Sequence, residues 1–327
     1  MRVLAGDVGG TKTLLALASV HDDAVEVISE ARYESPAYNG LAPIVRDFLP
    51  PGSFSVEGAC FGVPGPVVGG VCRTPNLPWL TSVEELARDT GLARVQLIND
   101  FAAAALGVLA LEPASLAVLQ EGRPEVHGTR AVLGAGTGFG QAILFWDGTR
   151  YRVNPGEAGH AGFAAQGKLQ HELVLRLEER HLPVSVERIL SGPGLLRIYR
   201  FLVSTGVPTS AEVEVALEHA DAGQVIADYA ARGVVACRQT IALFLDAYGA
   251  EAGSLALRAL AQGGMYVAGG IAPKILPFIR TGGFMDAFRR KGRLSALMGS
   301  FPVAVVLEPK VGLLGAALEA ARLAGSQ

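Results

Sequence analysis

The chain has few cysteines, no surplus of basic residues and no long apolar run, and each absence excludes a class of protein. Its 327 residues include three cysteines, Cys60, Cys72 and Cys237, with no C-x-x-C pair. Such a set excludes a disulfide-stapled small protein and a zinc knuckle, and it predicts reduced thiols in a cytoplasmic protein. The 28 Lys and Arg residues against 31 Asp and Glu residues leave a net charge of −3, so we expect no nucleic-acid partner.

A membrane location is not expected either. The longest uncharged apolar run, residues 101–111, is about half of the ~20 residues that a transmembrane helix needs. The apolar patch before Gly6 is too short for a secretion signal.

Glycine, by contrast, is abundant. It makes up 41 of the 327 residues, above the ~7% that is usual in proteins. Half of the residues are apolar, which is enough for a large packed core. Glycine at this frequency in such a chain predicts tight turns and loops in which backbone approaches a ligand closely.

Predicted strands and helices alternate along the chain, which indicates an α/β fold. Strands are predicted at 2–4, 13–19, 25–32, 54–63, 95–98, 131–133, 141–146, 265–267 and 303–307. Helices are predicted at 41–49, 81–90, 101–111 and 313–323, and over most of 169–202 and 211–260.

The order of these elements predicts two α/β domains. Residues 112–125 show no clear periodicity, so we expect a domain crossing near residue 110. A lone strand–helix unit cannot bury itself, so the last strand and helix are expected to return to the first domain. The predicted domains are 1–110 plus 301–327, and a larger one at 111–300 with inserted helices.

Three glycine-rich turns each follow a predicted strand. Glycine permits positive φ and lacks Cβ, so consecutive N–H groups in such turns can converge on an anion. The spacing matches neither the nucleotide-binding P-loop nor the Rossmann fingerprint. Plain hairpin turns are the alternative, but threonines in two turns and an acid in one favour phosphate binding. The candidate phosphate-binding residues are Gly6, Asp7, Val8, Gly9, Gly10, Thr11, Gly136, Thr137, Gly138, Gly269 and Gly270.

Asp7 lies within the first of these turns. A carboxylate beside a phosphate would repel it unless a cation lay between them. Asp7 therefore predicts Mg²⁺, bound directly or through water.

Asn99 and Asp100 follow a predicted strand and open a predicted helix. Ligands of open α/β sheets bind at such strand ends, where Asp100 could act as a general base for an alcohol that attacks a phosphoryl group. The alternative is that the pair only caps the helix.

Glu157, His160 and Glu187 are candidate ligands for hydroxyl groups. Glycines on both sides of Glu157 predict a shaped loop that can hold it and His160 in one pocket, where Glu accepts and His donates or accepts hydrogen bonds. A surface turn is the alternative for the first two, and a solvated helix face with Arg188 as ion-pair partner is the alternative for Glu187. A metal site at His160 is disfavoured because no cysteine lies nearby.

Seven strings of these residues occur in one order along nearly the whole chain. They are GDVGGTKT at 6–13, GVPGPV at 62–67, LINDFAAAALG at 97–107, GAGTGFG at 134–140, PGEAGH at 155–160, ERILSGPGL at 187–195 and AGGIAPK at 268–274. Together they resemble the bacterial glucokinase family of the hexokinase–actin–heat-shock-ATPase superfamily. The resemblance implies a ribonuclease-H-like, actin-like ATPase fold, with two domains and a cleft that closes on sugar.

The resemblance also implies an activity, the transfer of phosphate from ATP, with Mg²⁺, to glucose to give glucose 6-phosphate in a homodimer. It implies that Asp100 is the base for the 6-hydroxyl and that Asn99, Glu157, His160 and Glu187 bind the sugar. The first two glycine turns are implied to flank the phosphates, and Gly269 and Gly270 to lie near the adenosine. Residues 161–165 lack the cysteine cluster of the related zinc-bearing repressor/ORF/kinase branch, which places the chain outside that branch.

Three alternatives stay open at this point. The first is another hexose as the acceptor, since the sequence does not measure the pocket at the sugar's 2-position. The second is ADP or polyphosphate as the phosphoryl donor. The third is a sugar-binding regulator without turnover, which is disfavoured because Asp100 is present.

Overall fold

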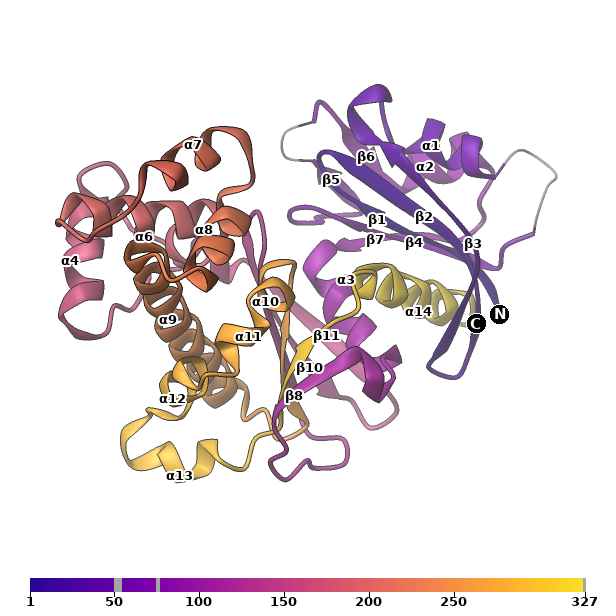
Figure 1. Ribbon diagram of the computed structural model, residues 1–327. Helices are drawn as coiled ribbons and strands as arrows, with labels where there is room; N and C mark the ends of the chain where they lie inside the picture. Colours follow the sequence, from indigo (N-terminus) through magenta and orange to yellow (C-terminus); the bar gives the residue numbers. More distant parts are fainter. Residues whose placement is uncertain (50–54, 75–76, 326–327) are drawn as a thin grey trace. The chain divides into compact units, whose positions relative to one another are not determined.

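The computed structural model describes residues 1–49, 55–74 and 77–325 and divides into two compact units (Figure 1). The first unit comprises Met1–Ser115, Val153–Pro155 and Glu308–Gln327. The second comprises Leu116–Arg152 and Gly156–Leu307. Each unit combines a sheet with helices, so the predicted α/β class is confirmed.

The first unit is built on a five-stranded sheet in the order β3-β2-β1-β4-β7. Its strands are β1 (Arg2–Val8), β2 (Lys12–His21), β3 (Ala24–Glu34), β4 (Gly58–Val63) and β7 (Val95–Asn99). Strands β1, β2 and β3 form an antiparallel meander, whereas β1, β4 and β7 run parallel. The parallel half brings the carboxyl ends of three strands to one edge of the sheet, which is where α/β proteins bind ligands.

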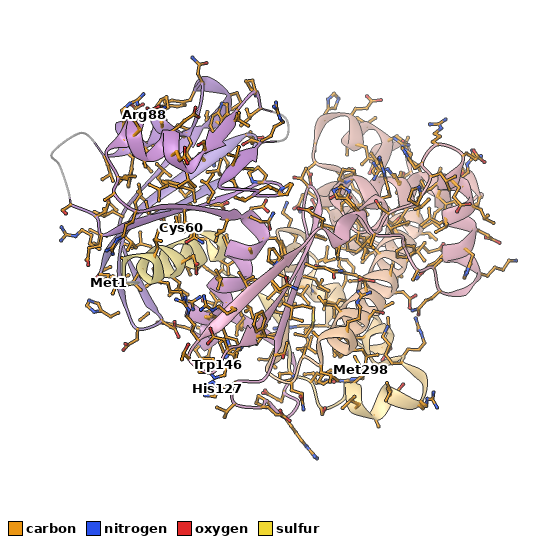
Figure 2. The ribbon with its side chains drawn as sticks, turned by 180° about the vertical axis from the view of Figure 1, so that it is seen from behind. Met1, Cys60, Arg88, His127, Trp146 and Met298 are labelled. Atoms are coloured by element: carbon orange, nitrogen blue, oxygen red, sulfur yellow. The ribbon has the colours of Figure 1, made fainter. Side chains whose placement is uncertain are left out.

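Helices cover both faces of this sheet (Figure 1). One face packs against α1 (Leu41–Phe48) and α2 (Val83–Thr90), and the other against α3 (Asp100–Gly107) and α14 (Val311–Gly325). Cys60 on β4, labelled in Figure 2, is buried in the cluster on the α14 side. Burial on both faces explains why β1 and β4 are apolar along nearly their whole length.

Smaller elements complete the first unit. A two-stranded hairpin pairs β5 (Val71–Arg73) with β6 (Leu80–Ser82). Single 3₁₀ turns lie at η1 (Ser35–Ala37), η2 (Val108–Ala110) and η3 (Pro113–Ser115). The predicted helix at 101–111 thus begins one residue earlier and ends at Gly107, after which the chain tightens into η2.

The second unit has a six-stranded sheet in the order β11-β10-β9-β12-β13-β8. The strands are β8 (Leu116–Gln120), β9 (Arg130–Ala135), β10 (Phe139–Trp146), β11 (Tyr151–Gly156), β12 (Gly264–Ala268) and β13 (Val303–Val306). Strands β9, β12 and β13 run parallel, and β10 and β8 pair antiparallel with β9 and β13. Near the outer end of β10, His127 stacks on Trp146 with ring centroids 3.9 Å apart (Figure 2).

A helical block accounts for most of the rest of the second unit. Its helices are α4 (Gly167–Glu178), α5 (Val186–Ile189), α6 (Gly192–Ser204), α7 (Ala211–His219), α8 (Ala222–Ala231), α9 (Val235–Ala259), α10 (Ile271–Lys274), α11 (Leu276–Ile279), α12 (Gly283–Arg289) and α13 (Ser295–Met298), with 3₁₀ turns η4 (Ala158–His160) and η5 (Gly292–Leu294). The long α9 is buried along much of its length, and its Tyr248 meets Phe244 and Phe284 in an aromatic cluster. Among the described residues, no helix is both long and apolar enough to cross a bilayer.

Two local predictions are wrong, and one strand was not predicted. The first unit ends at Ser115, close to the domain crossing expected near residue 110. The segment 112–125 also contains the unpredicted β8, whose register comes from antiparallel pairing with β13 rather than from a pattern of its own. The last strand, β13, stays in the second sheet between β12 and β8, so only α14 returns to the first unit. Residues Asn154–Gly156, expected in a loop, end strand β11. The predicted strand at 54–63 begins at Gly58, and residue 54 lies outside the described residues.

Candidate active site

Two carboxylates lie at the carboxyl-end edge of the first sheet. The pairing aligns Asp7 on β1 with Gly62 on β4, and Gly62 with Ile98 on β7, directly before Asn99 and Asp100. Adjacent strands are about 4.8 Å apart, so Asp7 and the end of β7 are separated by two strand spacings, about 10 Å. That distance is large enough for a phosphoryl group to fit between the two carboxylates.

Asp7 lies on strand β1 and not in a turn as the sequence suggested. The strand continues through it because Asp7 pairs with both Leu14 and Gly62. Gly6 is also on the strand, where a Cβ would overlap the Phe61 ring, so packing alone explains that glycine. The turn itself is Gly9–Thr11.

Burial raises the pKa of the Asp7 carboxyl above its ordinary value, and the charge of Lys12 partly offsets this. The start of α14 adjoins the carboxylate, since a Cβ on Gly312 would lie 3.7 Å from Asp7 Oδ2. A helix N-terminus favours negative charge, and a cation would relieve the remaining cost of burial.

The hairpin turn after β1 is held by buried hydroxyls. Ser35 Oγ donates to the Gly9 carbonyl at 2.7 Å and lies 3.0 Å from Thr13 Oγ1. The Ser35 amide donates to the Thr11 carbonyl at 3.0 Å. These bonds fix the turn's backbone, so Gly10 and Thr11 present preformed polar groups.

Asn99 and Asp100 have different local roles. Asn99 is the N-cap of α3, and its Oδ1 accepts from the amides of Phe101 at 2.9 Å and Ala102 at 3.1 Å. Asp100 is the first helical residue, and its Oδ1 accepts from the Phe101 amide at 2.7 Å. The capping alternative is therefore correct for Asn99, and capping of α3 does not require Asp100.

In the second unit, the turn after β9 is anchored on three sides. The Gly136 amide donates to the Gly138 carbonyl at 2.8 Å, and the Gly192 amide donates to the Gly136 carbonyl at 2.8 Å. The buried Tyr248 hydroxyl accepts from the Ala135 amide at 3.1 Å. The turn's shape is thus set by packing before any ligand binds.

Two glycines of this region face open space. A Cβ on Gly136 or on Gly270 would meet no protein atom within 4 Å, and neither backbone is left-handed. Gly269 differs, because its φ is +82° and a Cβ would lie 2.5 Å from the Ala135 carbonyl oxygen. Gly134 pairs with Ala268, so the Gly136 and Gly270 backbones follow adjacent parallel strands at one edge. Such a cradle, which a Cβ would fill, fits a nucleotide.

Glu187 lies beside the same turn. Its Oε2 accepts from the Phe139 amide at 3.0 Å, and a Cβ on Gly138 would lie 2.6 Å from that oxygen. A Cβ on Gly159 would lie 3.6 Å from it. Glu187 on α5 therefore contacts β10 and lies close to η4, so the alternative of a solvated helix face does not hold for it.

Glu157 and His160 are both exposed; Glu157 directly precedes η4 and His160 is its last residue. The single turn of η4 is closed by the His160 amide, which donates to the Glu157 carbonyl at 3.0 Å. The following segment is tied to α5, because the Val186 amide donates to the Ala161 carbonyl at 2.9 Å. The structure thus brings the loop with Glu157 and His160 next to Glu187 within one unit.

Across the described parts of the chain, no group of three or more His, Cys, Asp and Glu side chains is arranged to hold a metal ion. Mg²⁺ needs no such cage, because it usually binds one or two carboxylates, substrate phosphates and water. A half-buried acid such as Asp7 beside a helix N-terminus fits that role.

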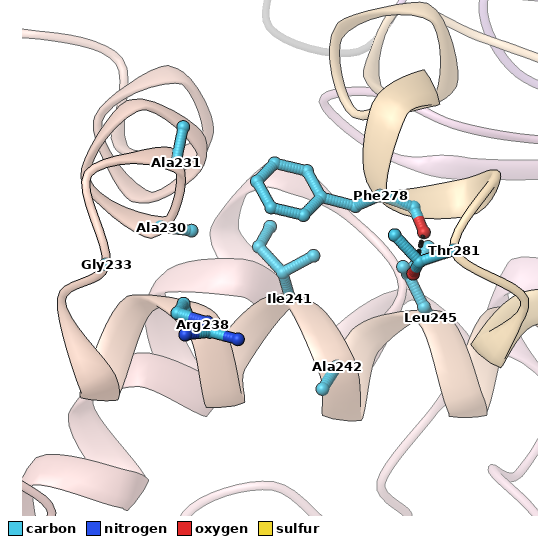
Figure 3. Close-up of a pocket in the computed structure, with 9 residues that line it drawn as sticks. All are labelled: Ala230, Ala231, Gly233, Arg238, Ile241, Ala242, Leu245, Phe278 and Thr281. Carbon is cyan, nitrogen blue, oxygen red and sulfur yellow. Dashed lines mark hydrogen bonds between the residues drawn. The ribbon is translucent and has the colours of Figure 1, made fainter.

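Two cavities of the second unit are lined by none of these candidate residues. One, of about 460 Å³, is lined by Ala230, Ala231, Gly233, Arg238, Ile241, Ala242, Leu245, Phe278 and Thr281 (Figure 3). It is largely apolar, with Phe278 lying over Ile241. The other, of about 340 Å³, lies between α4 and α6.

Comparison with known proteins decides the family. A family model described as Glucokinase matches residues 4–323. A protein of Nostoc punctiforme named glucokinase is 42% identical over 339 aligned residues, covering 98% of this chain and 99% of that protein. The chain belongs to the glucokinase family. The resemblance proposed from the seven strings is thereby confirmed.

Solved structures agree on the fold of this glucokinase-family chain. The crystal structure of a glucokinase from an Antarctic psychrotroph superposes with a TM-score of 0.86 at 30% identity, covering 98% of this chain and 99% of that one. A ROK family glucokinase from Streptomyces griseus, solved with glucose and AMPPNP, has a TM-score of 0.66 at 21% identity and covers 98% and 100%. The predicted actin-like ATPase fold is therefore confirmed.

Several supporting residues were not found from the sequence. Ser35 and Tyr248 hold the two turns, and Gly192 bonds to the second. These residues lie far along the chain from the turns that they fix, so spacing carries no signal for them.

Proposed function

We propose that this chain transfers the γ-phosphoryl group of ATP to the 6-hydroxyl of glucose, giving glucose 6-phosphate and ADP. The observation that carries the proposal is the edge of the first sheet, where Asp7 lies near the end of β1 and Asp100 directly follows β7, two strand spacings away. Membership of the glucokinase family and a 42% identical relative named glucokinase support glucose as the acceptor.

Asp100 acts as the general base in this proposal. It accepts the proton of the 6-hydroxyl as that oxygen bonds to the γ-phosphorus, and the bond from phosphorus to the bridging oxygen of ADP breaks. Asn99 binds the sugar beside it through its side-chain amide, which also donates to the Gly65 carbonyl at 3.3 Å. Mg²⁺ held by Asp7 would neutralise charge on the phosphates.

The second unit binds the rest of both substrates. Glu157, His160 and Glu187 take the ring hydroxyls of glucose, since carboxylates accept and imidazole donates or accepts. The backbone of Gly136–Gly138 takes phosphate oxygens, with Gly9, Gly10 and Thr11 doing so from the first unit. The open space at Gly136 and Gly270 supports binding of ATP there.

The two units correspond in this proposal to two domains that close on glucose. The proposed base and the proposed ring-hydroxyl ligands belong to different units, so one glucose molecule must engage both before transfer occurs. Closure would exclude water, which otherwise competes with the sugar for the phosphoryl group.

The cellular setting is proposed on similar grounds. The three cysteines are free and buried, which suits a reducing compartment such as the cytoplasm. By resemblance to its family, we propose a homodimer that supplies glycolysis with glucose 6-phosphate.

The test is Asp100→Asn with Asp89→Asn as the matched control, an exposed acid on α2 of the same unit. Losing a general base lowers turnover by ~10²–10⁴-fold. We expect that loss for Asp100→Asn in a coupled assay with ATP, with glucose binding retained, and normal turnover for Asp89→Asn. Near-normal turnover of Asp100→Asn would show that Asp100 is not the general base. A higher kcat/KM of the wild type for mannose, fructose or N-acetylglucosamine than for glucose would show that glucose is not the preferred acceptor.

A further inference from the structure

Four arginines lie in the lining of one cavity of the second unit. It has a volume of about 340 Å³ and lies between α4, the turn after it, and α6. Its lining residues are Leu173, Arg176, Leu177, Glu179, Arg180, Leu196, Arg197, Arg200, Phe201 and Ser204. Four arginines and one glutamate therefore share a space with leucine and phenylalanine side chains. None of the proposed substrate-binding residues is among them.

Only part of this positive charge is neutralised. Arg176 pairs with Glu179 at 2.9 Å, and Arg200 pairs with Glu214. Within the described parts of the chain, no ion pair involves Arg180 or Arg197. Two guanidinium groups thus lack a carboxylate in contact with them.

Arg197 occupies an electrically unfavourable position. It is half-buried in the middle of α6, and its Nη1 donates to the Arg188 carbonyl at 3.2 Å. Burial and the charge of Arg188 lower the pKa of Arg197, although Glu187 partly opposes this. Burial and the charges of Arg188, Arg197 and Arg180 also lower the pKa of His181. This concentration of cations favours an anion at this point.

We propose that this cavity binds a small phosphate monoester through Arg180 and Arg197, at a site distinct from those for glucose and ATP. A guanidinium fork binds phosphate oxygens in pairs, so two arginines satisfy most of a phosphate group. The leucine and phenylalanine lining contacts the carbon skeleton of the ester. A volume of about 340 Å³ suits a small metabolite and excludes a folded partner.

Occupancy of the site acts on the sugar-binding residues through α5. Arg197 bonds to the carbonyl of Arg188, and the preceding residue, Glu187, receives the Phe139 amide. An anion that recruits Arg197 pulls on the end of α5 and so shifts Glu187. This regulatory step rests on the proposed function, whereas binding of the anion does not.

Isothermal titration of the full chain tests the binding. The probes are 3-phosphoglycerate and inorganic phosphate, and the variants are Arg180→Gln and the control Arg293→Gln, an exposed arginine outside the cavity. We expect saturable binding of 3-phosphoglycerate at about millimolar concentration or below. Arg180→Gln should weaken it about tenfold or more through lost charge-assisted hydrogen bonds, and Arg293→Gln should not.

Three results would overturn the proposal. They are no saturable binding below about 10 mM, equal binding in the two variants, or binding of inorganic phosphate without the ester. Arg197→Lys keeps the charge but loses the fork, so it should bind more weakly than wild type and better than Arg197→Ala. These titrations need no turnover, so an inactive chain that binds the ester would refute the proposed function alone.

A kinetic measurement tests the coupling. With 3-phosphoglycerate present, we expect the glucose KM of the wild type to change and the ATP KM to stay constant, since Glu187 is a proposed ligand of glucose. Arg180→Gln should keep normal basal turnover and lose this response. An equal response in Arg180→Gln and wild type would show that the ester acts at the active site instead.

Discussion

Gly136 and Gly269 follow adjacent strands, but the fold requires glycine only at Gly269. This difference gives a sharp test of the proposed ATP binding at Gly136. A Cβ on Gly136 would meet no protein atom within 4 Å, and its backbone is not left-handed. The fold alone does not require glycine there. An alanine in an unstrained position should even stabilise the protein by about 0.4–1 kcal/mol, because it restricts the unfolded chain.

ATP binding by Gly136→Ala should nevertheless weaken. A methyl group in the open space would keep a phosphate oxygen from the backbone, which removes a charge-assisted hydrogen bond of ~1.5–3 kcal/mol. That energy corresponds to a rise of about ten- to a hundredfold in the ATP KM. The glucose KM should stay near the wild-type value, since the sugar is proposed to contact other residues.

Two further variants complete the comparison, measured by thermal unfolding and steady-state kinetics. Gly283→Ala is the matched control, because Gly283 on α12 also has open space and no left-handed backbone. It should change neither KM. Gly269→Ala should destabilise the protein by about 1–2 kcal/mol or more, since φ is +82° and the Cβ would lie 2.5 Å from Ala135 O. An unchanged ATP KM in Gly136→Ala would refute the cradle.

Three other predictions follow from the site. Burial raises the pKa of Asp7 above the ordinary value of 3.8, so the ionised carboxylate destabilises the folded protein. This destabilisation is absent below pH 3.8, grows as the pH rises through the folded-state pKa, and is constant at higher pH. Asp7→Asn should therefore melt at a higher temperature than wild type at pH 7, converge with it near about pH 4, and lose turnover; a lower melting temperature at pH 7 would contradict this. Glu157→Gln should raise the glucose KM about tenfold through a lost charge-assisted hydrogen bond and leave the ATP KM unchanged, whereas equal effects on both would make Glu157 structural. Asn99→Ala removes the cap of α3 and should cost about 0.5–2 kcal/mol in urea unfolding, and no loss would contradict the capping role.

Local signals in the sequence were sufficient for most elements. The helix predicted at 81–90 is α2, and Ser82 caps it by accepting from the Glu85 amide. The strand before Asn99 and the strand before Gly136 were likewise predicted from short apolar runs. In such segments consecutive residues show which side chains are buried, so a short window of sequence is enough to predict the element.

Predictions failed where pairing with a distant strand decides the structure. Leu116–Gln120 forms an edge strand only because it pairs with the outer side of β13, which lies nearly two hundred positions later in the chain. Asp7 looked like a turn residue because glycines flank it, yet pairing on both sides of β1 holds it in the sheet. Neither partner is visible in a local window of sequence.

The sequence by itself determined the family, the α/β alternation and the candidate residues, because each depends on residue types at fixed short spacings. Only the tertiary structure decided that Asn99 caps a helix, that Glu187 holds the Phe139 amide, and that Gly136 faces open space while Gly269 does not. The physical reason is that hydrogen bonds and steric contacts depend on distance in space. Folding brings Glu187 to Phe139, and no spacing along the chain encodes that contact.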